Sequence, residues 1–152
     1  MDVDGTLTDG KIYISSRGEE FKAFNVKDGY GISNILSSID VTPVIITGRT
    51  SDIVKKRADE LDIKEVYQGI SDKLSVLRRL CTKYSIFINE VAYIGDDVND
   101  IPAMLEAGLS FAPKDSVSEV KKIADFILNN AGGQGAVREC IEHIVNINED
   151  YS

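Results

Sequence analysis

The sequence predicts an α/β domain with a doubly wound parallel sheet, and three observations support this fold class. Short apolar runs recur along the chain, each followed within two residues by Thr, Gly or Asn. Segments with helical periodicity separate these runs. The chain has 152 residues, which matches the usual size of one domain. Parallel strands covered on both faces are continuous apolar runs, so the alternation favours a parallel sheet.

The first expected element is a β-hairpin at residues 11–25. Apolar residues such as Ile14 and Phe21 flank the turn sequence Ser-Ser-Arg-Gly at 15–18. An insertion of this length is too small to be a separate cap domain. We therefore expect one domain over residues 1–152 with an inserted hairpin.

Four strands and five helices are expected after the hairpin. The strands are 44–46, 65–67, 91–94 and 126–128, and the helices are 51–61, 72–84, 100–107, 116–124 and 135–145. In helix 51–61, Val54, Ala58 and Leu61 fall on one stripe, while lysines and acids occupy the other face. The repeated order of strand and helix is that of a doubly wound sheet. The last residues, 148–152, are expected to be frayed.

Composition excludes several classes of partner. Lys and Arg number 17 against 25 for Asp and Glu, which gives a formal net charge of −8. Nucleic acids and anionic membranes bind basic faces, so neither is the expected partner. No apolar run approaches the roughly 18 residues of a membrane span, and the N-terminus has no signal-peptide pattern. We expect a cytoplasmic protein.

The cysteines and the single histidine carry no chemistry in this interpretation. Cys81 and Cys140 have neither CxxC spacing nor a nearby His, so both are expected to be small buried hydrophobes. His143 lies in the last expected helix and is interpreted as structural.

The sequence Asp2-Val3-Asp4-Gly5-Thr6 places two carboxylates two positions apart before a turn-forming glycine. If the chain turns at Asp4, both acids reach one pocket, where one acts as nucleophile or metal ligand and the other transfers a proton. The alternative is an exposed acidic turn.

A second acidic cluster follows the expected strand 91–94. Asp96, Asp97, Asn99 and Asp100 lie within five positions. Because the carboxyl ends of parallel strands share one crevice, both clusters are expected to converge on one cation. Oxygen ligands without His or Cys favour Mg²⁺ over zinc. Helix capping by Asn99 or Asp100 is the alternative, and it explains one of the four residues.

Two further segments have the polar groups of a phosphate site. Thr47-Gly48-Arg49 ends the strand 44–46 and precedes a helix, so its hydroxyl and free backbone N–H groups can bind phosphate. The commoner alternative is a Thr or Ser N-cap. Lys73 lies at the start of the expected helix 72–84. The helix dipole disfavours a cation there, so a lysine at this position suggests another role, such as phosphate binding. Its alternative is a solvated surface lysine.

Taken in order, these four segments resemble the motifs of the haloacid dehalogenase superfamily of phosphatases, over nearly the whole chain. Three further segments narrow the resemblance: Thr8-Asp9-Gly10, residues 25–32 and residues 132–139. These segments resemble the capless sugar-acid phosphatases, which act on 3-deoxy-D-manno-octulosonate 8-phosphate or on nine-carbon sialic-type acids. The resemblance implies a Rossmann-like fold, a place in lipopolysaccharide biosynthesis, and a homotetramer in which the hairpins associate.

The resemblance also implies roles for the motif residues. Asp2 attacks phosphorus and forms an aspartyl-phosphate, while Asp4 protonates the leaving oxygen and later activates water. Mg²⁺ is held by the Asp2 carboxylate, the Asp4 backbone carbonyl and Asp96. Thr47 and Lys73 hold the phosphoryl oxygens. Three more residues accept hydrogen bonds that orient Lys73 and metal-bound water without binding the metal: Asp97, Asn99 and Asp100.

Substrate choice is assigned to Gly48, Arg49 and Arg57. The two arginines are eight residues apart, and both can face the crevice and bind a sugar carboxylate. The alternative for Arg57 is a surface arginine on a charged helix face. The resemblance suggests that residues 132–135 reach a neighbouring subunit's site, whereas the simpler interpretation is a turn before the last helix.

The resemblance further implies an apolar strand before the nucleophile, and only Met1 precedes Asp2. This departure indicates either a longer chain or a poorly anchored Asp2. The sugar-acid phosphatase is the leading hypothesis. A nine-carbon acid 9-phosphate phosphatase, or an inactive regulatory or oligomerisation domain of a cytidylyltransferase, is the alternative. A receiver domain does not fit an acidic cluster as late as residue 96.

Overall fold

The fold is built around two parallel sheets joined by the first residues of the chain. It is known from a computed structural model that describes residues 1–150, without the side chains of Glu20, Glu149 and Asp150. The first sheet pairs β3 (Val44–Ile46) with β4 (Glu65–Tyr67). The second has the order β5 (Ala92–Ile94), β6 (Leu109–Ala112) and β7 (Phe126–Ile127).

Met1 and Asp2 connect these two sheets through backbone hydrogen bonds. The Met1 ammonium donates to Val44 O at 2.9 Å, and Ile46 N donates to Met1 O at 3.0 Å. On the other side, Asp2 N donates to Ile94 O at 3.2 Å. The strands therefore follow the order β4, β3, residues 1–2, β5, β6 and β7, which is the parallel doubly wound sheet that the sequence predicted.

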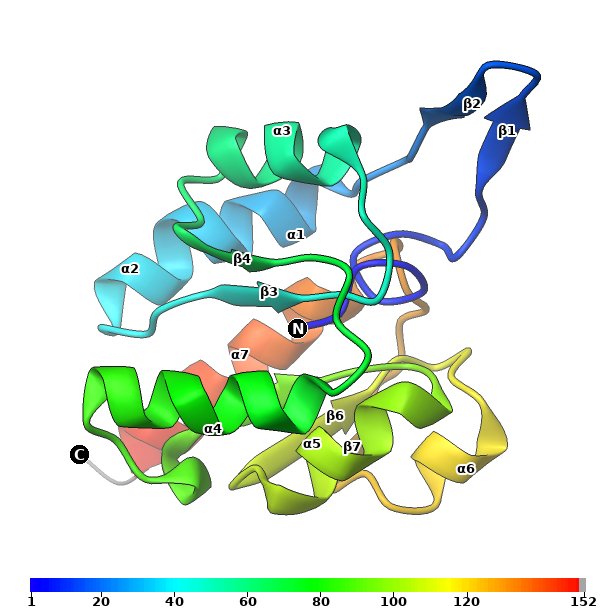
Figure 1. Cartoon of the computed structure of the whole chain (residues 1–152). Helices are drawn as coiled ribbons and strands as arrows, with labels where there is room; N and C mark the ends of the chain where they lie inside the picture. Colours follow the sequence, from blue (N-terminus) through cyan, green and yellow to red (C-terminus); the bar gives the residue numbers. More distant parts are fainter. Residues whose placement is uncertain (151–152) are drawn as a thin grey trace.

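Helices cover both faces of this sheet (Figure 1). They are, in order, α1 (Val26–Tyr30) continued by a π turn (Gly31–Ile35) and α2 (Leu36–Ser38), α3 (Asp52–Glu60), α4 (Lys73–Tyr84), α5 (Ile101–Glu106), α6 (Ser118–Lys121) and α7 (Ala136–Asp150). Short 3-10 turns at Ile88–Glu90 and Val98–Asp100 precede β5 and α5. None of the helices formed by residues 1–150 is long and apolar enough to cross a membrane.

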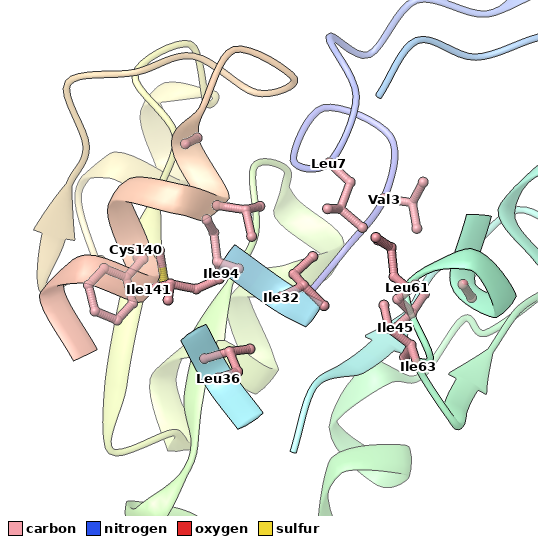
Figure 2. Packing of buried hydrophobic residues seen from close by; sticks show 14 of the residues in the cluster. Val3, Leu7, Ile32, Leu36, Ile45, Leu61, Ile63, Ile94, Cys140 and Ile141 are labelled. Carbon is pink, nitrogen blue, oxygen red and sulfur yellow. The ribbon is translucent and has the colours of Figure 1, made fainter. Parts of the chain in front are cut away.

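Two hydrophobic cores lie on opposite faces of the sheet. Ile45, Ile94 and Phe111 point into a core with the π turn, α2, α3 and α7, part of which Figure 2 shows. Their neighbours Ile46 and Tyr93 point into a second core with α4, α5 and α6. This alternation along each strand is the reason that the strands are apolar on both faces.

The hairpin is formed by β1 (Tyr13–Ser15) and β2 (Gly18–Phe21) and projects away from the sheet (Figure 1). Tyr13 and Phe21 are cross-strand partners, and their rings stack with centroids 4.3 Å apart. The predicted hairpin at 11–25 is confirmed, and no cap domain is present within the described residues.

The structure also corrects several predicted elements. Strand β6 was not predicted, because Ser110 interrupts its apolar run; Ser110 N and Oγ both donate to Asp125. The helical segment 26–38 was also missed. Its Gly31 lies where a Cβ would come within 2.9 Å of Ile141, so tertiary packing decides this position rather than helix propensity. Finally, α6 is shorter than 116–124.

At the C-terminus, α7 continues to Asp150, past the predicted end at residue 145. Residues 151–152 of the expected frayed end lie outside the described residues. Both cysteines are buried, and the His143 ring packs against Phe111 and Phe126, so these structural roles are confirmed.

Candidate active site

Residues of all four motifs gather at the carboxyl ends of the central strands. Asp2 lies on the segment between the two sheets, Thr47 directly follows β3, and Asp96 follows β5 by two positions. Lys73 begins α4 and is only 2 % exposed. Segments that are 94 positions apart in sequence therefore form one site because their strands are parallel neighbours.

Asp2 is firmly anchored, contrary to one of the expectations from the sequence. Its backbone N–H is bonded to Ile94 O, and the residue is 5 % exposed. Burial first, and then repulsion from Asp100, raise the pKa of the Asp2 carboxyl above its usual value.

The loop after Asp2 folds tightly against the second acidic cluster. Gly5 has a φ of +91°, and a Cβ there would lie 2.0 Å from Asp96 Oδ2, so only glycine allows this approach. The Thr6 hydroxyl donates to Asp96 Oδ1 at 2.8 Å. The Thr8 hydroxyl accepts from the backbone N–H of Gly5 at 3.3 Å and is therefore part of the turn.

Lys73 connects the two acidic motifs. Its Nζ lies 3.0 Å from Asp2 Oδ1 and 2.7 Å from Asp100 Oδ1. Burial alone lowers the pKa of a lysine, but Asp2 and Asp100 outweigh it and raise the pKa of Lys73. The two carboxylates explain why a cation lies at this helix start. Because Lys73 is buried, the alternative of a solvated surface lysine is wrong.

Asp100 is wholly buried, and both of its oxygens have protein partners. Oδ1 accepts from Lys73 and from the Tyr93 hydroxyl at 2.9 Å. Oδ2 accepts from the backbone N–H groups of Asp96 at 3.1 Å and Asp97 at 3.3 Å. Asp100 therefore orients Lys73 and the acidic turn at the same time.

The charge of the site fits a divalent cation. Asp2, Asp96 and Asp100 each offer one carboxylate oxygen, and these three oxygens lie within 4.8 Å of one another. Burial and then Asp2 raise the pKa of Asp96 to about 8. Three carboxylates face one lysine, and the oxygen donors are the kind that Mg²⁺ prefers. Because Asp100 is saturated by protein donors, Asp2 and Asp96 are the better placed ligands.

The Thr47 segment borders the same site. Thr47 is 2 % exposed, and its backbone N–H donates to Tyr67 O at 2.9 Å. Gly48 faces Asn99 across the crevice, since a Cβ on Gly48 would lie 3.8 Å from the Asn99 amide nitrogen. Asp97 is exposed and caps the turn before α5 by accepting from Val98 N at 2.7 Å.

Arg49 and Arg57 are not brought together. Arg49 is exposed, and its guanidinium lies 3.5 Å from the Glu19 carboxylate. Arg57 instead pairs with Glu60 on its own helix and lies over the Phe24 ring at 5.6 Å. Neither contact involves a residue of the acidic motifs, so the assignment of Arg57 to substrate stays a prediction.

The glycine-rich segment at 132–135 packs on its own chain. A Cβ on Gly132 would lie 1.9 Å from Gly5 O, and Gly133 N donates to Thr6 O at 3.1 Å. These contacts fit the simpler interpretation, a turn before the last helix, and the reach of the segment into a neighbouring subunit stays a prediction. Both glycines pack against the loop that follows Asp4, at Gly5, Thr6 and Thr8.

Sequence reasoning missed two hairpin residues at the site. Lys22 Nζ lies 2.6 Å from Asp4 Oδ1 and 3.2 Å from Glu19 Oε2. Glu19 also accepts a hydrogen bond from the Ser51 hydroxyl. Nothing in the local sequence distinguishes these residues from ordinary surface charges, because the contacts depend on how the hairpin folds back.

Comparison with known proteins agrees with this geometry. The sequence profile of the haloacid dehalogenase-like hydrolases matches residues 58–141. The chain is 48 % identical over 139 residues to 3-deoxy-D-manno-octulosonate 8-phosphate phosphatase from Escherichia coli strain K12, covering 91 % of this chain and 73 % of the relative. It is 44 % identical to the enzyme of the same name from Yersinia pestis, covering 95 % and 76 %.

Solved structures give the same result. The crystal structure of 3-deoxy-D-manno-octulosonate 8-phosphate phosphatase from Moraxella catarrhalis, in complex with a magnesium ion, a phosphate ion and a KDO molecule, aligns with a TM-score of 0.92. The two are 43 % identical, and the alignment covers 96 % of this chain and 83 % of that one. A cobalt-bound phosphatase of the same kind from Haemophilus influenzae aligns at 0.91 with 38 % identity, covering 95 % and 79 %. The chain belongs to the haloacid dehalogenase-like hydrolases.

Proposed function

We propose that this chain is a Mg²⁺-dependent phosphatase that hydrolyses 3-deoxy-D-manno-octulosonate 8-phosphate through an aspartyl-phosphate. The observation that carries the proposal is the position of Lys73, whose Nζ bonds both Asp2 and Asp100 inside a buried acidic site. This site lies in a chain that is 48 % identical to phosphatases named for that substrate.

The first step forms a bond between an Asp2 carboxylate oxygen and phosphorus and breaks the bond between phosphorus and the sugar oxygen. Asp4 donates a proton to that departing oxygen. Lys73 and Thr47 hold the phosphoryl oxygens, whose charge must be matched throughout the transfer.

The second step releases phosphate and restores the enzyme. A water molecule attacks the phosphorus of the aspartyl-phosphate, Asp4 accepts its proton, and the bond to the Asp2 oxygen breaks. Asp100 keeps Lys73 in place during both steps, because its Oδ1 accepts from Lys73 and its Oδ2 is fixed by two backbone N–H groups.

Asp2, Asp96 and the backbone carbonyl of Asp4 would hold Mg²⁺, which neutralises charge on the transferring phosphoryl group. The buried negative charge supports this assignment, since three carboxylates share one lysine. Asp97 and Asn99 orient water at the mouth of the site.

Substrate preference is assigned to Gly48 and Arg49, with Arg57 as a further contact. Arg49 is exposed, follows Thr47 by two positions and is suited to a sugar carboxylate. We infer that the chain works as a single phosphatase domain in the cytoplasm, in lipopolysaccharide biosynthesis. We also infer a homotetramer, for which the exposed apolar residues of the hairpin, Tyr13, Ile14 and Phe21, offer a surface.

The test is phosphate release from 3-deoxy-D-manno-octulosonate 8-phosphate and from a nine-carbon sugar acid 9-phosphate, each with Mg²⁺ or EDTA. We expect Mg²⁺-dependent release with preference for the eight-carbon substrate. Preference for the nine-carbon substrate would identify the chain as a nine-carbon acid 9-phosphate phosphatase instead. Absence of release from a folded protein would favour the regulatory or oligomerisation domain.

A further inference from the structure

A connected set of polar side chains links the hairpin to the first acidic motif. Lys22, just after β2, places its Nζ 2.6 Å from Asp4 Oδ1 and 3.2 Å from Glu19 Oε2. Glu19 in turn accepts from the hydroxyl of Ser51, the residue that directly precedes α3. The Asp4 carboxylate is therefore held through the hairpin to the start of a helix.

Burial separates this lysine from ordinary surface cations. The Lys22 side chain is 0 % exposed, although its hairpin projects from the fold. A buried ammonium requires anionic partners, and Lys22 has two, Asp4 and Glu19. For comparison, Lys11 at the entry to the same hairpin is 72 % exposed and lies 3.7 Å from Asp9.

The two acids of the first motif consequently have different cationic partners. Asp2 pairs with Lys73 in the interior, whereas Asp4 pairs with Lys22 from the hairpin side. A carboxylate held through one oxygen keeps its other oxygen for a different contact. The Asp4 side chain is also more exposed than the Asp2 side chain, at 18 % against 8 %.

The geometry points to Lys22 as a positioning residue that orients Asp4 for proton transfer to the leaving oxygen, with Glu19 and Ser51 holding Lys22 in place. The inference rests on the proposed phosphatase function. It makes the hairpin part of the active site of its own chain.

The stacked pair Tyr13 and Phe21 explains how the hairpin can hold Lys22 beside Asp4. Phe21 directly precedes Lys22, and its ring stacks on Tyr13 across the hairpin at 4.3 Å. This cross-strand contact fixes the end of β2, so the backbone at Lys22, the next residue, is also held in place.

The test compares Lys22→Met, Lys22→Arg and the control Lys11→Met by kcat/KM, which reports the steps up to departure of the leaving group. With the sugar-acid phosphate, we expect kcat/KM of Lys22→Met to fall by about 10- to 100-fold, because the alkoxide must be protonated. With p-nitrophenyl phosphate, whose phenolate leaves without a proton, the fall stays below about threefold. Lys22→Arg regains part of the loss, and Lys11→Met changes neither value.

The same comparison in an Asp4→Asn background tests whether Lys22 acts through Asp4. We expect Lys22→Met to add little to the effect of Asp4→Asn. A full additional loss would mean that Lys22 binds the sugar directly and would overturn the inference. Equal losses on both substrates would also overturn it, because they indicate a general structural defect.

A stability cycle keeps the inference testable even if the wild type releases no phosphate. Thermal unfolding of Lys22→Met, Asp4→Asn and the double variant measures the coupling between the two side chains. We expect the double variant to lose less in Tm than the sum of the single losses, by about 2 to 4 °C. An inactive wild type refutes the proposed function alone, whereas strictly additive Tm losses refute the link between Lys22 and Asp4.

Discussion

Lys73 and Asp100 form a buried ion pair, with Nζ 2.7 Å from Oδ1, although 27 positions separate them in the sequence. The pair brings the start of α4 to the turn after β5. Since Lys73 also bonds Asp2, one ammonium group holds three segments of the chain together. The same contact therefore contributes to folding and to the electrostatics of the site.

Replacing this lysine is expected to damage both properties. Lys73→Met leaves Asp2 and Asp100 buried without their counter-charge, which costs about 3 to 5 kcal/mol of unfolding free energy. Urea denaturation measures this loss. The exposed residue Lys55 provides the control Lys55→Met, for which we expect less than about 0.5 kcal/mol. A Lys73→Met protein as stable as the wild type would contradict the structural role.

Asp2→Asn is expected to abolish turnover without unfolding the protein. The amide cannot form the aspartyl-phosphate, so phosphate release falls by more than about 10³-fold. Circular dichroism checks that the fold is kept. Asp52→Asn, at an exposed acid on the first turn of α3, serves as control and keeps full activity. Retained turnover in Asp2→Asn would show that another group attacks phosphorus.

Metal removal gives a prediction that does not depend on turnover. Mg²⁺ at about 100 times its dissociation constant adds about 2.7 kcal/mol to stability and raises Tm. EDTA reverses the shift and stops phosphate release. In Asp96→Asn, the loss of one charged ligand is expected to remove most of the Mg²⁺-dependent rise. An unchanged rise in this variant would place the metal elsewhere.

Gly132→Ala tests the support behind the catalytic loop. The new Cβ would lie 1.9 Å from Gly5 O, so the loop that directly follows Asp4 must move. Gly108→Ala creates a similar clash, 1.8 Å from Asn89 O, away from the site. We expect both variants to lose stability, but only Gly132→Ala to lose kcat when assayed below its Tm. Equal kcat in the two variants would argue against the loop support.

Glu65 gives a pH-dependent stability that is independent of the active site. Its carboxylate accepts from Lys83, then from the Tyr67 and Tyr84 hydroxyls, which lower the pKa of Glu65 from 4.5 to about 2. Because the folded pKa lies below the unfolded one, the stabilisation is complete above about pH 4.5 and is lost toward pH 2.

Glu65→Gln is therefore expected to be less stable than the wild type by about 2 kcal/mol at pH 7. The two proteins should converge as the pH falls below 4.5. Urea titrations between pH 3 and 7 measure the difference, and Glu142→Gln, at an exposed ion pair, shows little at any pH. A difference that is constant with pH would exclude the charged carboxylate as its cause.

Local patterns were sufficient to predict much of this molecule. The apolar runs at 44–46 and 65–67 coincide with β3 and β4, and the helical stripe at 51–61 coincides with α3. These predictions succeed because burial on one or two faces leaves a direct periodic trace in the sequence. The turn signal at 15–18 likewise located the hairpin.

Only the tertiary structure decided which residues meet. Lys22 pairs with Asp4, Gly132 packs against Gly5, and Arg57 lies over the Phe24 ring. Each of these contacts joins segments that are distant in the sequence. The sequence by itself determined the hairpin, strands β3, β4, β5 and β7, helices α3 to α7 and the four motifs, but not β6 or the helical segment 26–38. The fold decided their partners, since charge pairing and close backbone approach depend on distances in space that no local pattern records.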